Sequence, residues 1–370
     1  MANTLGIRGY DVVEFYVGSA KMTAYWFSRA FGLDIVAYAG PESGVKDKTS
    51  YLLQKNKLKI VVTSPTSPNA YELNSFTSQH GDGVKKITYE VTDVPHIFNH
   101  ALSKGAVPAS HPTEHQDEHG SVWDASVQLY DDTELVFVNY DKYKGLYRPG
   151  FMAPRSNSKP QREETNLLAV DHVVGNVRKH EMDTWAKFFV DVLDFETFIE
   201  FGPGDISTKY SALLSKVVRS KDGLIKNPIN EPYEGLKKSQ IEEYLEQYHG
   251  SGIQHIAIST NNILETIQAM RNNGVEFLQA PQQYYQGLRD KKVKIKESID
   301  DLEKLGILCD VEDLAGGGYL LQLFTKPIGD RPTFFFEIIQ RCEGSQGFGH
   351  GNFQALFESI EREQALRGNL

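Results

Sequence analysis

The sequence has little cysteine, no long apolar run and no excess of basic residues. Its 370 residues include two cysteines, Cys309 and Cys342, too few for a disulfide framework or a cysteine-based zinc site. We expect both to be reduced thiols. The formal net charge of -10 opposes binding to nucleic acid or an anionic membrane, because phosphate contacts need clustered lysine and arginine. Small-molecule chemistry is the better expectation.

No apolar run approaches the length of a membrane span, and the first residues lack a basic region followed by an apolar core. A cytoplasmic protein without membrane or nucleic-acid partners is therefore expected. With 370 residues, 40% of them hydrophobic and 24% charged, the chain has an ordinary globular composition and exceeds the usual size of one domain. We expect two domains, each with a sizeable core.

The two halves of the chain resemble each other. Two clear matches and a weaker third align segment 11–17 with 171–177, 80–87 with 249–256, and 133–137 with 333–337. Three titratable residues of the second half are not retained in the first. His172 aligns with Val12, His255 with Lys86 and Glu337 with Phe137. Duplication of a supersecondary unit, followed by loss of ligands from one copy, explains this pattern. The first half then serves as scaffold and the second keeps the chemistry.

A polar segment separates the halves. The stretch from Arg148 to Asn166 is rich in Pro, Ser, Arg and Glu, and alternating strand patterns lie on both sides of it. We place the linker at residues 151–166, between an N-terminal domain at 1–150 and a C-terminal catalytic domain at 167–370.

The second half predicts a strand, a helix and several strands, twice over. The predicted strands cover 167–177, 195–201, 208–218, 252–259, 318–325 and 333–340, and the helices include Trp185 to Val192 and Ile263 to Asn273. This rhythm indicates an α+β fold of repeated βαβββ modules that form two open half-barrels, each with a concave face. Phe353, Leu356, Phe357 and Ile360 predict an amphipathic terminal helix, capped by Asn352, that covers a sheet face or closes the site.

His172, His255 and Glu337 each lie in an apolar, strand-like run, where a titratable group is costly without a partner or a metal. A single histidine of this kind is more often a core residue with a satisfied hydrogen bond. However, one side chain from each of three strands can converge inside a half-barrel. Two imidazoles and one carboxylate on one side of a divalent iron form the facial triad of non-haem Fe(II) oxygenases.

The other histidines and a glycine run are better explained by local structure. We expect a solvated loop or short exposed helix at His111, His115 and His119, a helix surface at His96 and His100, and turns at His180, His249 and Gly316 to Gly318.

Several segments together resemble the 4-hydroxyphenylpyruvate dioxygenase family of the vicinal-oxygen-chelate superfamily. The resemblance spans nearly the whole chain and is dense after residue 165; it is carried by segments 171–177, 227–232, 252–257, 320–327, 336–341, 346–349, 351–353 and 366–370. It implies the vicinal-oxygen-chelate fold and conversion of 4-hydroxyphenylpyruvate and O2 to homogentisate and CO2 in tyrosine and phenylalanine catabolism. It also implies Fe(II) held by His172, His255 and Glu337.

The resemblance assigns roles to further residues. A polar network of Ser215, Asn230, Gln240 and Gln254 would position the substrate, Gln322 would hydrogen-bond near the keto acid, and Pro228, Phe324, Phe348 and Phe353 would shape the pocket. Core packing is an equally good explanation of the phenylalanines. A homo-oligomer, a dimer or tetramer with contacts through the first half, is also expected, although no symmetry signal is readable.

Three other functions stay open. A 4-hydroxymandelate synthase would share the triad and the substrate but hydroxylate the benzylic carbon; Pro228, Asn230 and Phe324 favour the dioxygenase pattern. A ring-cleaving extradiol dioxygenase is disfavoured by the segments at 227–232 and 347–349. A metal-free binding module is disfavoured by the triad itself.

Overall fold

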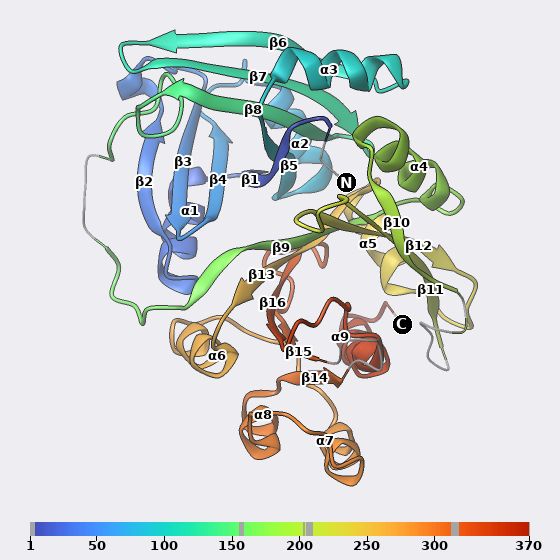
Figure 1. Cartoon of the computed structure of the whole chain (residues 1–370). Coiled ribbons are helices and arrows are strands. Elements are labelled where there is room, and N and C mark those ends of the chain that lie inside the picture. The colour runs from blue at the N-terminus through green and yellow to red at the C-terminus, as the bar shows by residue number, and fades with distance from the viewer. Residues whose placement is uncertain (1–3, 155–158, 203, 205–209, 312–317, 370) are drawn as a thin grey trace.

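The computed structural model describes residues 4–154, 159–202, 204, 210–311 and 318–369. Two curled sheets of eight strands each dominate this part of the chain (Figure 1). The first sheet contains β1 (Ile7–Tyr16), β2 (Asp34–Ala39), β3 (Lys48–Lys55), β4 (Leu58–Pro65), β5 (Gly83–Val91), β6 (Pro108–Asp117), β7 (Gly120–Leu129) and β8 (Thr133–Tyr143). The second contains β9 (Leu167–Asn176), β10 (Glu196–Phe201), β11 (Ala212–Arg219), β12 (Lys226–Tyr233), β13 (Gly252–Thr260), β14 (Leu308–Val311), β15 (Tyr319–Phe324) and β16 (Phe335–Cys342).

Helices connect and cover the sheets. They are α1 (Ala20–Ala30), α2 (Tyr71–His80), α3 (Val94–Ser103), α4 (Met182–Leu193), α5 (Gln240–Tyr248), α6 (Ile263–Asn272), α7 (Gln282–Asp290), α8 (Ile299–Leu305) and α9 (Phe353–Leu366), with short 3-10 turns η1 (Pro41–Ser43) and η2 (His350–Asn352). In Figure 1, α7 and α8 lie at the end of the molecule away from the first sheet.

Both sheets have the same topology. The strand orders are β2-β3-β4-β1-β5-β8-β7-β6 and β10-β11-β12-β9-β13-β16-β15-β14, which are identical when the second copy is renumbered from its first strand. In each sheet the two modules meet at a central antiparallel pair, β1 with β5 and β9 with β13. The predicted α+β fold of repeated βαβββ modules is thereby confirmed.

The helix-covered faces of the two sheets share one apolar core. Phe15 and Phe27 of the first half pack against Phe334 and Phe336 of the second, with ring centroids 5.0 Å apart for Phe15 and Phe334 and 5.7 Å for Phe27 and Phe336. Since Phe336 precedes Glu337 in β16, this packing holds the strand whose other face carries the carboxylate.

Two strands differ from what their sequences suggest. The predictions did not include β12, which contains Pro228 and Pro232, yet all its residues but the last are buried. It pairs with β11 along its length but with β9 only at Ile229 and Asn230, so both prolines lie outside that second ladder. The expectation of a loop or helix at 111–119 was wrong for its first part: β6 is an edge strand that pairs with β7 and is exposed on both faces, which removes the apolar alternation.

Other local predictions can be compared directly. Helix α3 contains His96 and His100, and His180 and His249 adopt positive φ angles in turns, as expected. Helix α9 begins at Phe353 as predicted, but the Asn352 side chain does not cap it. Instead, the Asn352 Oδ1 accepts a hydrogen bond of 2.6 Å from the Tyr284 hydroxyl. Residues 208, 209, 316 and 317 of the predicted strand and turn lie outside the described residues.

In the described part of the chain, no helix is long and apolar enough to cross a membrane. Cys309 and Cys342 are both buried and not joined by a disulfide, as expected for reduced thiols.

Candidate metal centre and substrate cavity

Three neighbouring strands carry the predicted triad. Ala257 of β13 lies opposite His172 of β9 on one side and opposite Glu337 of β16 on the other. Since side chains directly opposite each other project from the same face, both ligands flank the small Ala257 methyl group. His255 precedes Ala257 by two residues, so it projects from that face too. The strand register therefore brings three distant residues to one point on the concave side.

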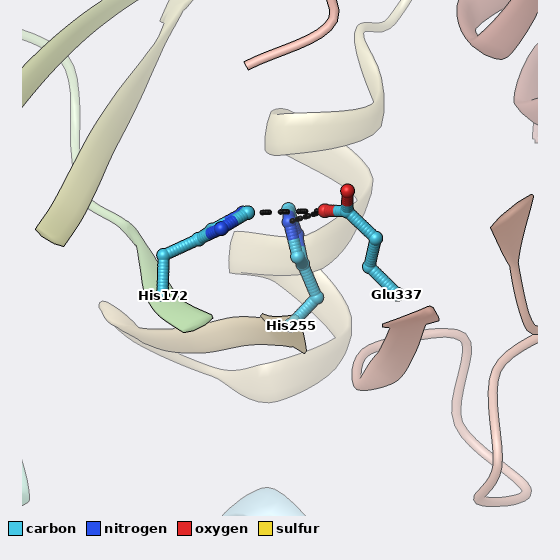
Figure 2. Close-up of side chains that lie close together, drawn as sticks. All are labelled: His172, His255 and Glu337. Carbon is cyan, nitrogen blue, oxygen red and sulfur yellow. Dashed lines mark ion pairs between the residues drawn. The ribbon is translucent and has the colours of Figure 1, made fainter. Parts of the chain in front are cut away.

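The ligand atoms are close enough to share one cation (Figure 2). The Glu337 Oε2 lies 3.2 Å from the His172 Nε2 and 3.4 Å from the His255 Nε2, and all three ligand atoms lie within 4.8 Å of one another. In an octahedral site with bonds of about 2.1 Å, adjacent ligand atoms are about 3.0 Å apart. Within the described residues, this is the one group of three or more His, Cys, Asp or Glu that could hold a metal ion.

Each histidine is oriented by the residue that precedes it. The His172 Nδ1 donates to the Asp171 carboxylate at 2.8 Å, and the His255 Nδ1 donates to the Gln254 Oε1 at 3.0 Å. Both Nε2 atoms consequently face Glu337. Such outer-shell partners fix the imidazole tautomer and raise the basicity of the ligand atom.

Burial and charge act in opposite directions on the triad. Burial raises the pKa of Glu337, but the neighbouring imidazoles outweigh it and lower this pKa overall. At His172 burial lowers the pKa, while the Glu337 charge and the Asp171 hydrogen bond raise it above the ordinary value. At His255 burial dominates and the pKa is lowered. The pKa shifts of Glu337 and His172 have one cause: the buried Glu337 carboxylate and the His172 imidazole each stabilise the charged form of the other, and a divalent cation bound between them would compete with the imidazole proton.

A cavity adjoins the triad, and all three triad residues line it. Its lining includes eight of the residues predicted to shape or polarise the pocket: Ser215, Pro228, Asn230, Gln240, Gln254, Phe324, Phe348 and Phe353. Gln240 is placed by a capping box at the start of α5, because the Ser239 hydroxyl accepts from the Glu242 N–H and the Glu242 carboxylate accepts from the Ser239 N–H.

Gln322 is not part of that lining. It lies on β15, is 1% exposed, and neither of its amide atoms has a hydrogen-bond partner among the described residues. Its amide group packs against Gly349, where an added Cβ would lie 2.4 Å from the Gln322 Oε1. Gly349 also has a φ of 75°, so a larger residue there would be strained and would collide with Gln322.

Comparison with known proteins identifies the family. A family model described as the Glyoxalase/Bleomycin resistance protein/Dioxygenase superfamily matches residues 169–297. The 4-hydroxyphenylpyruvate dioxygenase of Yarrowia lipolytica is 42% identical and aligns with 98% of this chain and 94% of its own length. That of Danio rerio is also 42% identical, over 97% of this chain and 91% of its own. The chain belongs to the 4-hydroxyphenylpyruvate dioxygenase family. The resemblance drawn from the sequence is confirmed.

Among solved structures, a triple mutant of 4-hydroxymandelate synthase from Streptomyces coelicolor superposes with a TM-score of 0.84. It is 27% identical and covers 96% of this chain and 98% of its own. Identity to the dioxygenases is thus higher than to this synthase.

Strand periodicity could have found one further residue that lines the cavity. Phe335 stacks on the His255 ring at 4.8 Å and lies two residues before Glu337, on the same strand face. The other lining residues absent from the sequence-based set are Val174, Phe201, Leu213, Val217, Leu356 and Phe357. Asp171 was also missed, although a carboxylate beside a ligand histidine is a recognisable signal.

The strand register corrects one alignment between the halves. Lys86 and His255 occupy equivalent positions in the two sheets. Lys86 is opposite Glu14 of β1 and Glu134 of β8. His255 is opposite Val174 of β9 and Phe335 of β16. Thr88 therefore corresponds to Ala257, and its partner Val136 occupies the place of Glu337. The match of Phe137 with Glu337 was wrong by one residue, and Phe137 faces the shared core. A one-residue slip moves a side chain to the other face of a sheet.

Proposed function

We propose that the chain converts 4-hydroxyphenylpyruvate and O2 to homogentisate and CO2, in tyrosine and phenylalanine catabolism, with Fe(II) held by His172, His255 and Glu337. The observation that carries the proposal is the site itself. Two imidazoles and one carboxylate meet beside a largely apolar cavity, in a chain 42% identical to 4-hydroxyphenylpyruvate dioxygenases.

The donor set fits a divalent iron, because two neutral imidazoles and one carboxylate on one face are the ligands of non-haem Fe(II) oxygenases. When bound, Fe(II) would act as a Lewis acid toward the 2-keto acid and supply the one-electron chemistry that O2 requires. The keto acid itself provides the remaining electrons as it loses CO2, so no 2-oxoglutarate or nicotinamide is needed.

The polar residues of the cavity are proposed to orient the substrate. Gln254 links two parts of the site, because its Oε1 accepts from His255 while its Nε2 lies 3.5 Å from the Gln240 Oε1. Asn230 is buried in β12 and donates to the Asn176 Oδ1 at 3.3 Å. Together with Ser215, opposite Asn230 in β11, these side chains offer hydrogen bonds to the ring hydroxyl or the keto acid.

The apolar residues are proposed to exclude water and hold the aromatic ring. Phe324, Phe348 and Phe353 approach from β15, the loop after β16 and α9, and Pro228 adds a rigid wall from β12. Exclusion of water protects reactive intermediates and strengthens polar interactions in the site. Gln322 would hydrogen-bond toward the keto acid after a small change of the loop at Gly349, since its amide is unpartnered among the described residues.

Domain roles, assembly and location are proposed on the same basis. Residues 1–150 would form a scaffold that also makes subunit contacts, 151–166 a linker, and 167–370 the catalytic domain. A homo-oligomer, a dimer or tetramer, in the cytoplasm is proposed; light scattering coupled to gel filtration measures its mass.

The experiment that tests the function supplies anaerobically Fe(II)-loaded protein with 4-hydroxyphenylpyruvate and O2. The aromatic product is identified by mass spectrometry and NMR alongside O2 uptake. Homogentisate with equimolar O2 uptake supports the proposal. A His172→Ala variant that remains folded and loses turnover is the matched control. An absence of O2 uptake by iron-bound wild-type protein would overturn it.

A second candidate, 4-hydroxymandelate synthase, is favoured by one observation, the TM-score of 0.84 to that enzyme's structure. The two reactions share the substrate and differ in the carbon that is hydroxylated. Detection of 4-hydroxymandelate as the main product in the same experiment would move the assignment to the synthase.

A further inference from the structure

Arg341 contacts the residue that orients a metal ligand. It lies in β16, four residues after Glu337, and its side chain is 16% exposed. Its Nε donates to the Asp171 Oδ2 and its Nη2 to the Asp171 Oδ1, both at 2.8 Å. The same Oδ1 accepts from the His172 Nδ1 at 2.8 Å. Arg341 is thus joined to His172 through one carboxylate.

A bulge in the strand pairing makes this arrangement possible. In β9, Val170 and His172 are opposite the consecutive residues Ile258 and Ala257, so Asp171 is the extra residue. In a regular strand Asp171 and His172 would project to opposite faces. The bulge turns the Asp171 side chain toward the face of His172, so the carboxylate can accept a hydrogen bond from the imidazole of the next residue.

Arg341 also holds the loop that carries Phe348. Its Nη1 donates to the Gly347 carbonyl at 2.7 Å, and its guanidinium lies 5.7 Å from the centre of the Phe348 ring. The Phe348 ring in turn meets the His172 ring edge-on at 5.2 Å and lines the cavity. One guanidinium therefore contacts both the support of His172 and the backbone beside the cavity wall.

We propose that Arg341 is a positioning residue that fixes the His172 imidazole through Asp171 and the Phe348 side of the substrate cavity through Gly347. A planar guanidinium suits this position because it makes a bidentate bond to the carboxylate and keeps a further N–H for the carbonyl. The inference rests on the proposed metal site. It adds that a single residue, Arg341, links the orientation of the His172 imidazole to the position of the cavity wall at Phe348.

The first half provides an internal comparison. The β1–β5 pairing has an extra residue between Tyr10 and Val13, where Asp11 lies, as Asp171 does in β9. The Asp11 Oδ2 accepts from the Tyr140 hydroxyl at 2.9 Å, and Tyr140 follows Val136 by four residues as Arg341 follows Glu337. The bulged aspartate and its partner from the neighbouring module are thus present in both halves, whereas the ligand and the arginine occur in the second.

The test measures Co(II) affinity of the metal-free full-length protein, without keto acid, for wild type, Arg341→Met, Arg341→Lys and Tyr140→Phe. Loss of an outer-shell partner lowers metal affinity roughly 10- to 100-fold, which is the change expected for Arg341→Met. Arg341→Lys keeps a cation beside Asp171 and should recover most of the affinity. Tyr140→Phe breaks the matching bond in the first half and should lower thermal stability with Co(II) affinity unchanged.

The second readout is the Michaelis constant for 4-hydroxyphenylpyruvate. It should rise in both Arg341 variants, because neither side chain can bond to Asp171 and to the Gly347 carbonyl together. Wild-type Co(II) affinity in a folded Arg341→Met protein would overturn the proposal. If Arg341→Met does not fold, an Arg341→Lys protein with unchanged affinity and unchanged Michaelis constant overturns it instead. Wild-type protein that binds Co(II) but forms no homogentisate contradicts the proposed function, and the comparison of Co(II) affinities still decides whether Arg341 positions His172.

Discussion

At the scale of single residues, the small Ala257 side chain leaves room for the triad. Ala257 is fully buried between the strands that carry His172 and Glu337, and its methyl group leaves the space that the two ligand side chains occupy. In the first half the three equivalent positions are Val12, Lys86 and Val136, and the Lys86 ammonium lies 3.6 Å from the Glu134 carboxylate. A side-chain cation thus pairs with a carboxylate in the half that lacks the ligands.

Glu337→Gln should abolish turnover and weaken Co(II) or Fe(II) binding by at least about 100-fold, more than the loss of an outer-shell partner. The amide keeps the shape of Glu337 but not its charge. Without that charge, burial should bring the pKa of His172 down from its raised value. Titration of the His172 ring protons by NMR in metal-free protein measures this shift.

The same pKa sets the pH dependence of metal binding in the wild type. Protonated His172 cannot ligate, so affinity should increase as pH rises through its raised pKa and fall below it. The Glu337→Gln protein should reach its own maximal affinity at lower pH. An unchanged His172 pKa in the variant would contradict the pairing of these residues.

The two thiols should be unreactive in the folded protein. Burial raises the pKa of Cys309 to about 12, and it also raises the pKa of Cys342, so neither forms a thiolate at neutral pH. Ellman's reagent at pH 8 should label no thiol within minutes and both after unfolding in guanidinium. Rapid labelling of the native protein would show that the sheet around β14 opens readily.

At the scale of elements, α9 forms part of the cavity wall and is anchored at its far end. Phe353, Leu356 and Phe357 line the cavity from its first two turns. Beyond its last turn, the Arg367 Nη2 donates to the Glu243 Oε2 of α5 at 2.8 Å, and Glu243 is 3% exposed. The position of the apolar wall thus depends on an ion pair between a buried glutamate and a partly exposed arginine.

Glu243→Gln should loosen α9 and uncouple O2 consumption from product formation, because water enters when the wall moves. The ratio of homogentisate formed to O2 consumed should fall, and amides in 353–366 should exchange faster with deuterium. Deletion from Gly351 onward should have a larger effect in the same direction. Asp191→Asn, which breaks the exposed ion pair with Lys187 on α4, is the control. Unchanged coupling in both the variant and the deletion would refute the role of α9 in closing the cavity.

The elements also show what the sequence could predict. The triad was predictable because the two copies differ at positions that should otherwise be equivalent, and α4 and β13 have clear periodicity. Strand β12 was not, since two prolines and several polar residues resemble a loop, and only its place between β11 and β9 makes it a strand. The bulges at Asp171 and Gln254 could not be predicted from the sequence either, because a bulge is a property of the pairing between two strands.

At the scale of the whole molecule, the first half supports the site from behind. The Tyr10 hydroxyl donates to the Lys226 carbonyl at 2.7 Å, and the Asn227 Nδ2 donates to the Tyr89 hydroxyl at 2.9 Å. These bonds hold the start of β12 immediately before Pro228 and Asn230. The half without metal ligands therefore positions residues of the cavity in the other half.

The halves also meet around His80, which is fully buried. Its ring stacks on Tyr248 of α5 at 4.2 Å, and its Nδ1 lies 2.6 Å from the Tyr248 carbonyl oxygen. Helix α5 carries Gln240 at its other end, so this contact fixes a further cavity element against the first half.

Because one apolar core joins the halves, the protein should unfold as a single unit. Phe336 packs on Phe27, which lies in α1, and on Phe31, which directly follows that helix. Phe336→Ala should therefore lower the free energy of unfolding by about 3–5 kcal/mol, the usual range for removing a buried phenylalanine. Scanning calorimetry should show one transition with equal calorimetric and van't Hoff enthalpies, shifted to lower temperature in the variant. Residues 167–370 expressed alone would expose the Phe336 face and should aggregate. Two separate transitions, with the variant shifting the later half alone, would instead mean that each sheet folds independently and that the first half is dispensable for the geometry of the triad.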